Sequence, residues 1–283
     1  MNHESFYRDL TSRNRTLIPA ELQNRLRRQR FVIAGVGSTG GACVMPLIRT
    51  GAERLVLVDP GRYEVSNLNR QEARLSDVGR NKAQVQAERA LEVNPFVQVE
   101  AHDCGIDPEN AGHLLHDGDV VIDAVDVTEA SGVAAKVALH HAGCALHLRV
   151  ITAYDIASTQ YVELYDYTRT RRPLRGRVEA GERDPLRLLR ALVPLTALPH
   201  EMFAVLKDQR VHPEKGWPQL AMTSGALGPL VVAYVLRLLC DRPVRRSVRV
   251  DALDTVRPLA WRMLHRRRRD LSLALALWQD YGG

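Results

Sequence analysis

The chain has 283 residues, 45% of them hydrophobic, which is enough for the core of one large α/β domain or of a domain with a small appendage. Its net charge is +6, and much of the excess is arginine at 169–177 and 265–270. Such runs are most often solvated loops or tails, and less often bind phosphate-bearing or acidic partners. Because the sequence shows no window of ~18 uncharged apolar residues and no secretory pattern at its start, we expect a cytoplasmic protein that does not enter a membrane.

Four widely separated cysteines form no CxxC pair, which indicates neither a tetrahedral zinc site nor a disulfide framework. We expect reduced thiols that are mostly buried, including Cys240 at the end of an apolar helix. The four are Cys43, Cys104, Cys144 and Cys240.

Strands and helices alternate from residue 30 to residue 150, after a polar N-terminal stretch in which Pro19 is suited to start a helix. The expected strands are 30–35, 54–59, 97–101, 119–124 and 145–150, and the expected helices are 19–29, 38–51, 81–93, 108–116 and 129–142. This alternation predicts a mainly parallel sheet covered on both faces.

The pattern changes after residue 150. An Arg- and Pro-rich segment at 166–218 has no clear periodicity, and segments of that length are usually lids or substrate platforms. The later expected elements are an antiparallel or exposed strand at 158–167, a helix near 185–208, a buried helix from Thr223 that is too short to span a bilayer, strands near 246–251 and 257–263, and a short terminal helix.

A glycine-rich loop directly follows the first expected strand. Gly35, Gly37 and Gly40 form GxGxxG at the start of a helix, so backbone amides and the helix N-terminus point at a phosphate. Asp59 lies 19 residues after Gly40, at the end of the second strand, where a carboxylate can accept two ribose hydroxyls. We expect a mononucleotide or dinucleotide site, with glycines kept only for a tight turn as the alternative.

A second polar cluster bears on the choice between NAD and ATP. Asn67, Arg70 and Gln71 follow Asp59 in one loop, and Lys82 starts the next helix. An arginine and a lysine near the phosphates would offset the charge of a triphosphate and stabilise departing pyrophosphate. Otherwise, Arg70 could be a surface residue and Lys82 an ordinary lysine on a helix face.

Two carboxylates mark the end of the buried strand at 119–124. Ligands of open parallel sheets lie at the carboxyl ends of the strands, and Mg²⁺ prefers one or two carboxylates together with phosphate oxygens and water. We expect Asp126, beyond the strand, to bind magnesium, and Asp123 to be a hydrogen-bonded structural carboxylate.

Together these motifs resemble the MoeB/ThiF/HesA adenylating proteins, relatives of the ubiquitin-activating enzymes. The resemblance is carried by GVGSTGG, LVDPGRYEVSNLNRQ, DVGRNKAQ and VIDAVD between about Ser12 and Asp126, and more loosely by TSGALGPLVVAYVLRLL and VRVDALD. It implies a Rossmann-like homodimer that binds ATP and magnesium and activates a carboxylate as an acyl-adenylate. The usual substrate is the C-terminus of a ubiquitin-like or sulfur-carrier protein.

The resemblance also implies a role for each matched residue. Asp59 would hold the ribose, and Arg13, in the run SRN, would reach the α-phosphate region of the partner subunit. The expected ATP-binding residues are Gly35, Gly37, Ser38, Gly40, Asp59, Asn67, Arg70, Gln71 and Lys82, and the expected catalytic residues are Arg13, Arg70, Lys82 and Asp126, the last as metal ligand.

Departures from the family's pattern narrow the expected chemistry. Ser38 stands where the loop usually has glycine, and Val127 replaces a frequent asparagine. Members that form a thioester or persulfide present a cysteine in the crossover segment, and many carry two CxxC pairs, but residues 145–239 contain no cysteine. We therefore expect ATP-dependent adenylation with release of pyrophosphate and no enzyme thioester. The acceptor could be an external amine, thiol, persulfide or water, or a group within the substrate.

Three other functions stay open. A nicotinamide-dependent oxidoreductase would share the glycines and Asp59 but would leave Arg70, Lys82 and Asp126 without a task. A dehydratase-type relative acting on a tRNA or a peptide fits the basic segment at 169–177, although nucleic acid is the less favoured partner. A non-catalytic scaffold would keep the fold alone.

The predicted fold class is α/β: a Rossmann-like, mainly parallel sheet with helices on both faces, extended by C-terminal antiparallel strands. Its expected parts are an N-terminal helical arm at 1–28, an ATP-binding Rossmann-like domain at 29–165, a crossover or substrate segment at 166–222, and a C-terminal helix and strands at 223–283 that complete the same domain.

Overall fold

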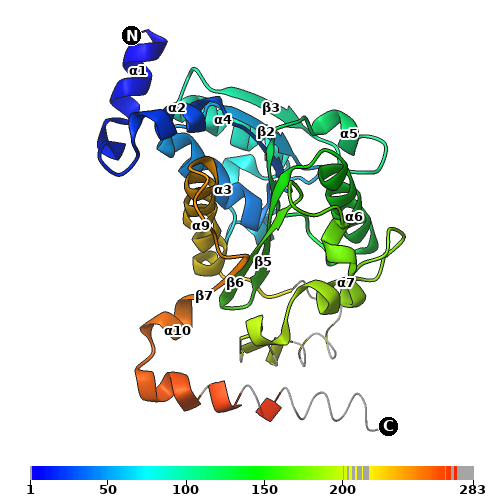
Figure 1. Cartoon of the computed structure of the whole chain (residues 1–283). Coiled ribbons are helices and arrows are strands. Elements are labelled where there is room, and N and C mark those ends of the chain that lie inside the picture. The colour runs from blue at the N-terminus through cyan, green and yellow to red at the C-terminus, as the bar shows by residue number, and fades with distance from the viewer. Residues whose placement is uncertain are drawn as a thin grey trace.

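A seven-stranded sheet forms the centre of the computed structural model (Figure 1), in the order β3-β2-β1-β4-β5-β6-β7. The strands are β1 (Arg30–Ala34), β2 (Arg54–Val58), β3 (Gln98–His102), β4 (Val120–Asp123), β5 (Arg149–Ile156), β6 (Thr159–Asp166) and β7 (Ser247–Asp251). The first five are parallel, whereas β6 and β7 pair antiparallel, which confirms the predicted fold class. The structure describes residues 2–199, 201, 202, 204, 205, 208, 212, 217–264, 266–268, 271 and 272.

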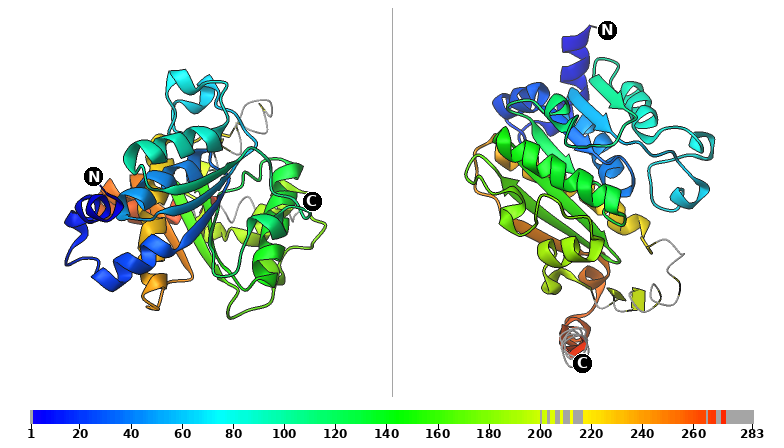
Figure 2. Two further views of the ribbon diagram at one scale, coloured as in Figure 1. Left: turned by 90° about the horizontal axis from the view of Figure 1, so that it is seen from above. Right: turned by 90° about the vertical axis from the view of Figure 1, so that its right-hand side faces the viewer.

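Helices pack on both faces of this sheet (Figure 2). On one face the core lies between the strands and α2 (Ala20–Arg28), α3 (Ser38–Thr50), α4 (Lys82–Val93) and α9 (Ala221–Leu239). On the other face it lies between the strands and α5 (Ala111–Leu114), α6 (Ala130–Ala145) and α7 (Pro185–Leu192). The described chain also contains α1 (His3–Leu10) and α10 (Ala252–Val256).

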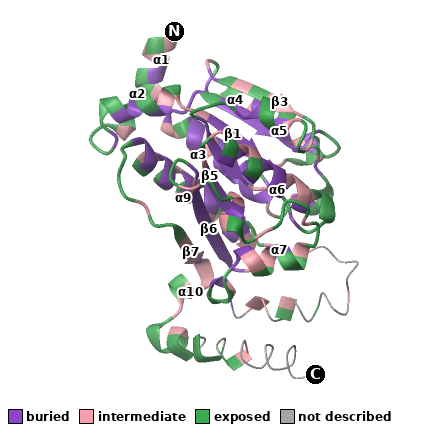
Figure 3. Cartoon of the chain, turned by 45° about the vertical axis from the view of Figure 1, so that its right-hand side comes forward, coloured by how far each residue is buried: buried purple, intermediate pink, exposed green. Residues whose placement is uncertain are grey.

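The central strands are buried along almost their whole length, as Figure 3 shows in purple. Apart from Arg30, Arg54 and Asp123 at their ends, β1, β2 and β4 consist of Val, Ile, Leu, Phe and Ala, the composition expected of parallel strands that are covered on both faces. Their carboxyl ends meet at one edge of the sheet, where the glycine loop begins. This edge is therefore the place for a ligand.

Several predicted boundaries differ from the structure. β5 covers 149–156 rather than 145–150, because Ala145, expected to begin the strand, is the last residue of α6. The helix expected at 185–208 is shorter, because α7 ends at Leu192 and residues 193–199, which include Pro194 and Pro199, are not α-helical. The strand predicted near 257–263 is wrong, since residues 259–264 are helical. Residues 273–283, where the terminal helix was expected, lie outside the described residues.

The helix α9 was expected to be too short for a bilayer, and this is wrong. It has 19 residues and, by length and apolar composition alone, could cross a membrane. Half of its apolar window is buried within the protein, where side chains such as Leu227, Val231 and Val235 pack in the core beside α3. We interpret α9 as a core helix.

Candidate functional site

The glycine loop between β1 and α3 depends on two glycines for its shape. Gly35 has a φ of +81°, a conformation that favours glycine, and a Cβ there would lie 2.4 Å from the carbonyl oxygen of Ala124. A Cβ on Gly40 would lie 1.9 Å from the carbonyl oxygen of Gly35. These contacts let the start of α3 pack closely against β1 and β4.

Gly37 faces two of the predicted polar side chains. A Cβ at this position would lie 3.7 Å from the side-chain amide of Gln71 and 3.7 Å from Lys82 Nζ. Lys82 Nζ is also 3.4 Å from where a Cβ on Gly61 would stand. Within the described chain, Gln71 Oε1 is buried without a hydrogen-bond partner. The loop, the Gln71 amide nitrogen and the ammonium group thus form one cradle that is suited to an anionic ligand, whereas Gln71 Oε1 can accept a hydrogen bond from a donor on the ligand.

Asp59 joins the glycine loop to the end of β2. Its carboxylate is 7% exposed and accepts hydrogen bonds from the backbone amides of Val36 at 2.6 Å and Gly61 at 2.7 Å. The Asn81 side chain, which caps α4, donates to the backbone carbonyl of Asp59 at 2.8 Å. Each carboxylate oxygen keeps a lone pair that can accept a ribose hydroxyl.

Arg70 lies beside this cradle, whereas Asn67 is occupied elsewhere. Arg70 donates to the carbonyl oxygen of Ser66 at 2.9 Å and, through Nε, to the side-chain oxygen of Gln219. Asn67 is buried, and its Oδ1 accepts from the backbone amide of Glu64 at 3.2 Å, capping the 3₁₀ helix η2 (Val65–Asn67). A phosphate contact for Asn67 stays a prediction.

Asp126 fits a magnesium site by its position and exposure. It lies in the loop between β4 and α6, is exposed, and accepts one hydrogen bond, from the Thr128 amide to Oδ1 at 2.9 Å. A single accessible carboxylate next to a phosphate-binding loop matches the preference of Mg²⁺ for carboxylate, phosphate and water oxygens.

Asp123 is fully buried and hydrogen-bonded, as expected. It accepts hydrogen bonds from Lys136 Nζ at 2.5 Å, His140 Nε2 at 3.0 Å and Thr152 Oγ1 at 3.0 Å. Burial opposes its charge, but the attraction of Lys136 and the bond from His140 hold the pKa of Asp123 well below its usual range. Lys136 and His140 are missing from the predicted residues, because a lone lysine or histidine on a helix carries no signal of a buried partner.

A second wall of the site is formed by residues later in the chain, which the sequence analysis did not predict. Ser38 Oγ is 2.5 Å from Ser224 Oγ in the first turn of α9, and Ser224 donates to Asp155 Oδ2 at 2.7 Å. Gln219, just before α9, is the partner of Arg70. No short motif connects these residues, so only the packing of β5 and α9 against α3 reveals them.

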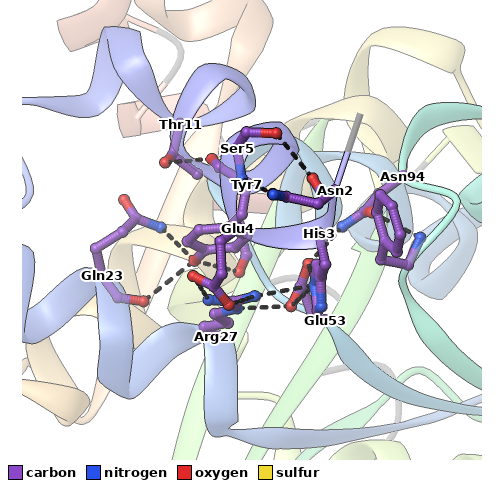
Figure 4. A network of polar contacts seen from close by, with 12 residues as sticks. Asn2, His3, Glu4, Ser5, Tyr7, Thr11, Gln23, Arg27, Glu53 and Asn94 are labelled. Carbon is purple, nitrogen blue, oxygen red and sulfur yellow. Dashed lines mark hydrogen bonds and ion pairs between the residues drawn. The ribbon is translucent and has the colours of Figure 1, made fainter.

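Arg13 does not approach the glycine loop of its own chain. It lies exposed in η1 (Ser12–Asn14). The N-terminal arm is anchored by a hydrogen bond of 2.8 Å from the Tyr7 hydroxyl to the Gly51 carbonyl. Figure 4 shows a second anchor, the ion pair of 2.8 Å between Arg27 and Glu53. Gly51 follows the C-terminal end of α3, whose 13 residues put its two ends about 18 Å apart. Within one chain Arg13 is thus remote from the glycine loop, and its catalytic role across a subunit interface stays a prediction.

Two of the four thiols are exposed, which corrects the expectation that they are mostly buried. Cys43 and Cys144 are buried, and burial raises the pKa of both. Cys104 lies in the loop after β3, and Cys240 caps α9 beyond its last buried turn, so both reach the surface.

A cavity of about 470 Å³ adjoins the cradle on the α3, α4 and α9 side. Arg70 and Gln71 line it, but the glycine loop, Asp59 and Lys82 do not, so it lies next to the candidate nucleotide site rather than within it. Its size is within the range of small-molecule sites. The other polar side chains that line it are Arg49, Asn69, Glu72, Arg74, Arg89 and Glu92.

Comparison with known proteins identifies relatives of the chain. The model of the ThiF family matches residues 11–269. An uncharacterised Mycobacterium tuberculosis protein, MT1398, is 33% identical over 86% of this chain and 35% of its own length. The sulfur carrier protein adenylyltransferase of Thermus thermophilus is 40% identical over 38% of this chain and 40% of its own length. Both alignments thus cover well under half of the relative.

The same fold occurs in solved structures that hold a nucleotide. The E. coli tRNA N6-threonylcarbamoyladenosine dehydratase in complex with ATP superposes with a TM-score of 0.62 and 20% identity, over 85% of this chain and 98% of that one.

Proposed function

The chain belongs to the ThiF family, and from this premise we propose that it uses ATP to convert a carboxylate into an acyl-adenylate, with release of pyrophosphate and without an enzyme thioester. The observation that carries the proposal is the convergence of Gln71 and Lys82 on Gly37, with Arg70 and Asp126 close in the sequence to the same sheet edge. An NAD-dependent enzyme has no need for this concentration of cationic and amide donors.

The proposed reaction requires no nucleophile from the protein. Asp59 would accept the ribose hydroxyls, and Arg70 and Lys82 would offset the charge on the α-phosphate and the leaving pyrophosphate. A substrate carboxylate oxygen would attack the α-phosphorus in line, so that the new C–O–P bond forms as the bond to pyrophosphate breaks. Magnesium, when held by Asp126, would supply further neutralisation of the phosphates.

The substrate that we favour is the C-terminus of a ubiquitin-like or sulfur-carrier protein, or a peptide. The similarity to a sulfur carrier protein adenylyltransferase supports this choice. A tRNA- or peptide-modifying dehydratase-type reaction is the second candidate, favoured by the arginine-rich segment at 169–177 and by the fold shared with a tRNA dehydratase. We propose a cytoplasmic homodimer, since Arg13 can act only on another subunit's site.

Nucleotide binding and pyrophosphate exchange test the proposal. ATP should bind to the protein in a fluorescence titration and NADH should not. A pulldown with ATP present, analysed by mass spectrometry, would supply the acyl substrate, and that substrate should then support ATP–pyrophosphate exchange. Binding of NADH in preference to ATP would favour the oxidoreductase, and ATP binding without exchange would favour a scaffold.

A further inference from the structure

Three side chains form a hydrogen-bonded chain that ends at the glycine loop. Asp155 lies near the end of β5, Ser224 in the first turn of α9, and Ser38 is the first residue of α3. Ser224 Oγ donates to Asp155 Oδ2 at 2.7 Å and lies 2.5 Å from Ser38 Oγ. Ser38 belongs to the loop that would bind the phosphates, so Asp155 is connected to the nucleotide site through two hydroxyl groups.

The surroundings of Asp155 favour its protonated form. Its Oδ1 is buried and lacks a hydrogen-bond partner in the described chain, so ionisation would leave charge uncompensated there. Burial raises the pKa of Asp155 to about 6, although Ser224, Arg70 and Ser38 act to lower it. Arg70 is the charged group that acts on Asp155. The neighbours of Asp155 on α3, α9 and β6 are Ser38, Ser224 and Gln160, which are neutral.

A hydroxyl group has one proton to donate, so the charge on Asp155 sets the direction of the chain. When Asp155 is ionised, it accepts the proton of Ser224, Ser38 must then donate to Ser224, and Ser38 offers a ligand only lone pairs. When Asp155 is protonated, it donates to Ser224. Ser224 Oγ has two acceptors left, Ser38 Oγ at 2.5 Å and the Leu220 carbonyl at 3.2 Å, and the shorter contact favours donation to Ser38. The Ser38 proton is then free for a phosphate oxygen.

We propose that Asp155 is a positioning residue of the nucleotide site, which determines through Ser224 whether Ser38 offers a phosphate oxygen a donor or an acceptor. Nucleotide binding is thereby coupled to protonation of Asp155. The inference rests on the proposed function, because it needs phosphates at the glycine loop. No covalent bond changes, and the proton comes from solvent.

The sign of the pH effect follows from this coupling. A bound phosphate stabilises the protonated carboxyl and raises the pKa of Asp155 in the complex. ATP affinity is therefore highest below about pH 6, the pKa of Asp155 in the free protein. Above that pH the affinity falls by at most about tenfold per pH unit, until the pH exceeds the pKa of Asp155 in the complex.

The test is the dissociation constant of ATP between about pH 5.5 and 8 for the wild type and three variants. Asp155→Asn offers Ser224 an amide donor at every pH, Ser224→Ala breaks the connection, and Ser38→Gly removes the final hydroxyl. In the wild type the affinity for ATP should change by about tenfold over this pH range, the size expected for one hydrogen bond to a charged group. Each variant should lack this change. The phosphate of ATP titrates in the same pH range, so the quantity to compare is the difference in pH dependence between the wild type and each variant.

A matched control lies at the other end of the same strand pair. Asp166 pairs in register with Arg149 at the start of β5, and Asp166→Asn should keep the wild-type pH profile. If Asp155→Asn does not fold, Ser38→Gly carries the same test. ATP binding with one pH profile in the wild type and all variants would overturn this inference and leave the proposed function standing. A wild type that binds no ATP would overturn both.

Discussion

The two walls of the candidate site are built in different ways. The phosphate wall consists of the glycine loop, Asp59, Arg70, Gln71 and Lys82, which all lie between the end of β1 and the start of α4. The opposite wall consists of Asp155, Gln219 and Ser224, which come from β5, the segment before α9, and α9. The difference teaches that local sequence motifs place the side chains suited to binding phosphate. The residues that hydrogen-bond to those side chains are placed by the packing of elements far apart in the sequence.

The largest expected effect concerns the buried ion pair between Lys136 and Asp123. Lys136→Met should lower the free energy of unfolding by about 3–5 kcal/mol, because it leaves the Asp123 carboxylate buried without its main counter-charge. Chemical denaturation would measure this. The double variant Lys136→Met/Asp123→Asn should recover much of the loss, since no buried charge remains unpaired. A single variant as stable as the wild type would show that the pair does not hold β4 and α6 together.

The next effect separates activity at the candidate site from the stability of the fold. Asp126→Ala should lower ATP–pyrophosphate exchange by about 100-fold or more, corresponding to about 3 kcal/mol of transition-state stabilisation. The unfolding curve should not change, because the side chain is exposed. Glu129→Ala, an exposed carboxylate in the same loop, is the matched control and should keep full exchange. Unaltered exchange in Asp126→Ala would refute the magnesium assignment.

A third experiment asks whether a partner subunit completes the site. Arg13→Ala and Asp126→Ala should each be inactive alone. After mixing and subunit exchange, about a quarter of the wild-type activity should return, because half of the dimers are mixed and each has one intact site. Failure to recover activity, although mass spectrometry shows mixed dimers, would mean that Arg13 does not act across the interface.

The smallest expected effect concerns the two exposed thiols. The variant Cys104→Ser/Cys240→Ser should keep its adenylation rate and its stability within about 0.5 kcal/mol, because neither side chain is packed in the core. Incubation of the wild type with ATP and substrate should give no adduct that a reducing agent removes. An adduct lost in this variant would return the protein to the thioester-forming members of its family.

The sequence was sufficient for the fold class, whereas the phosphate-binding roles of the predicted residues stay predictions. Alternating apolar runs and helices predicted the parallel sheet, and the spacing of Gly35, Gly37 and Gly40 after β1 predicted a phosphate-binding turn whose close packing the structure shows. Asp123 was correctly interpreted as structural. These features depend on neighbours within one β-α-β unit, so their physics is contained in a short stretch of residues.

Other features depended on residues far away in the chain. The end of α6, the exposure of Cys240 and the helix at 259–264 follow from what each segment packs against, which periodicity alone does not contain. Asp155 and Ser224 look ordinary in the sequence. They become part of the site only because β5 and α9 bring a buried carboxyl and a hydroxyl against Ser38, and burial then changes the chemistry of that carboxyl.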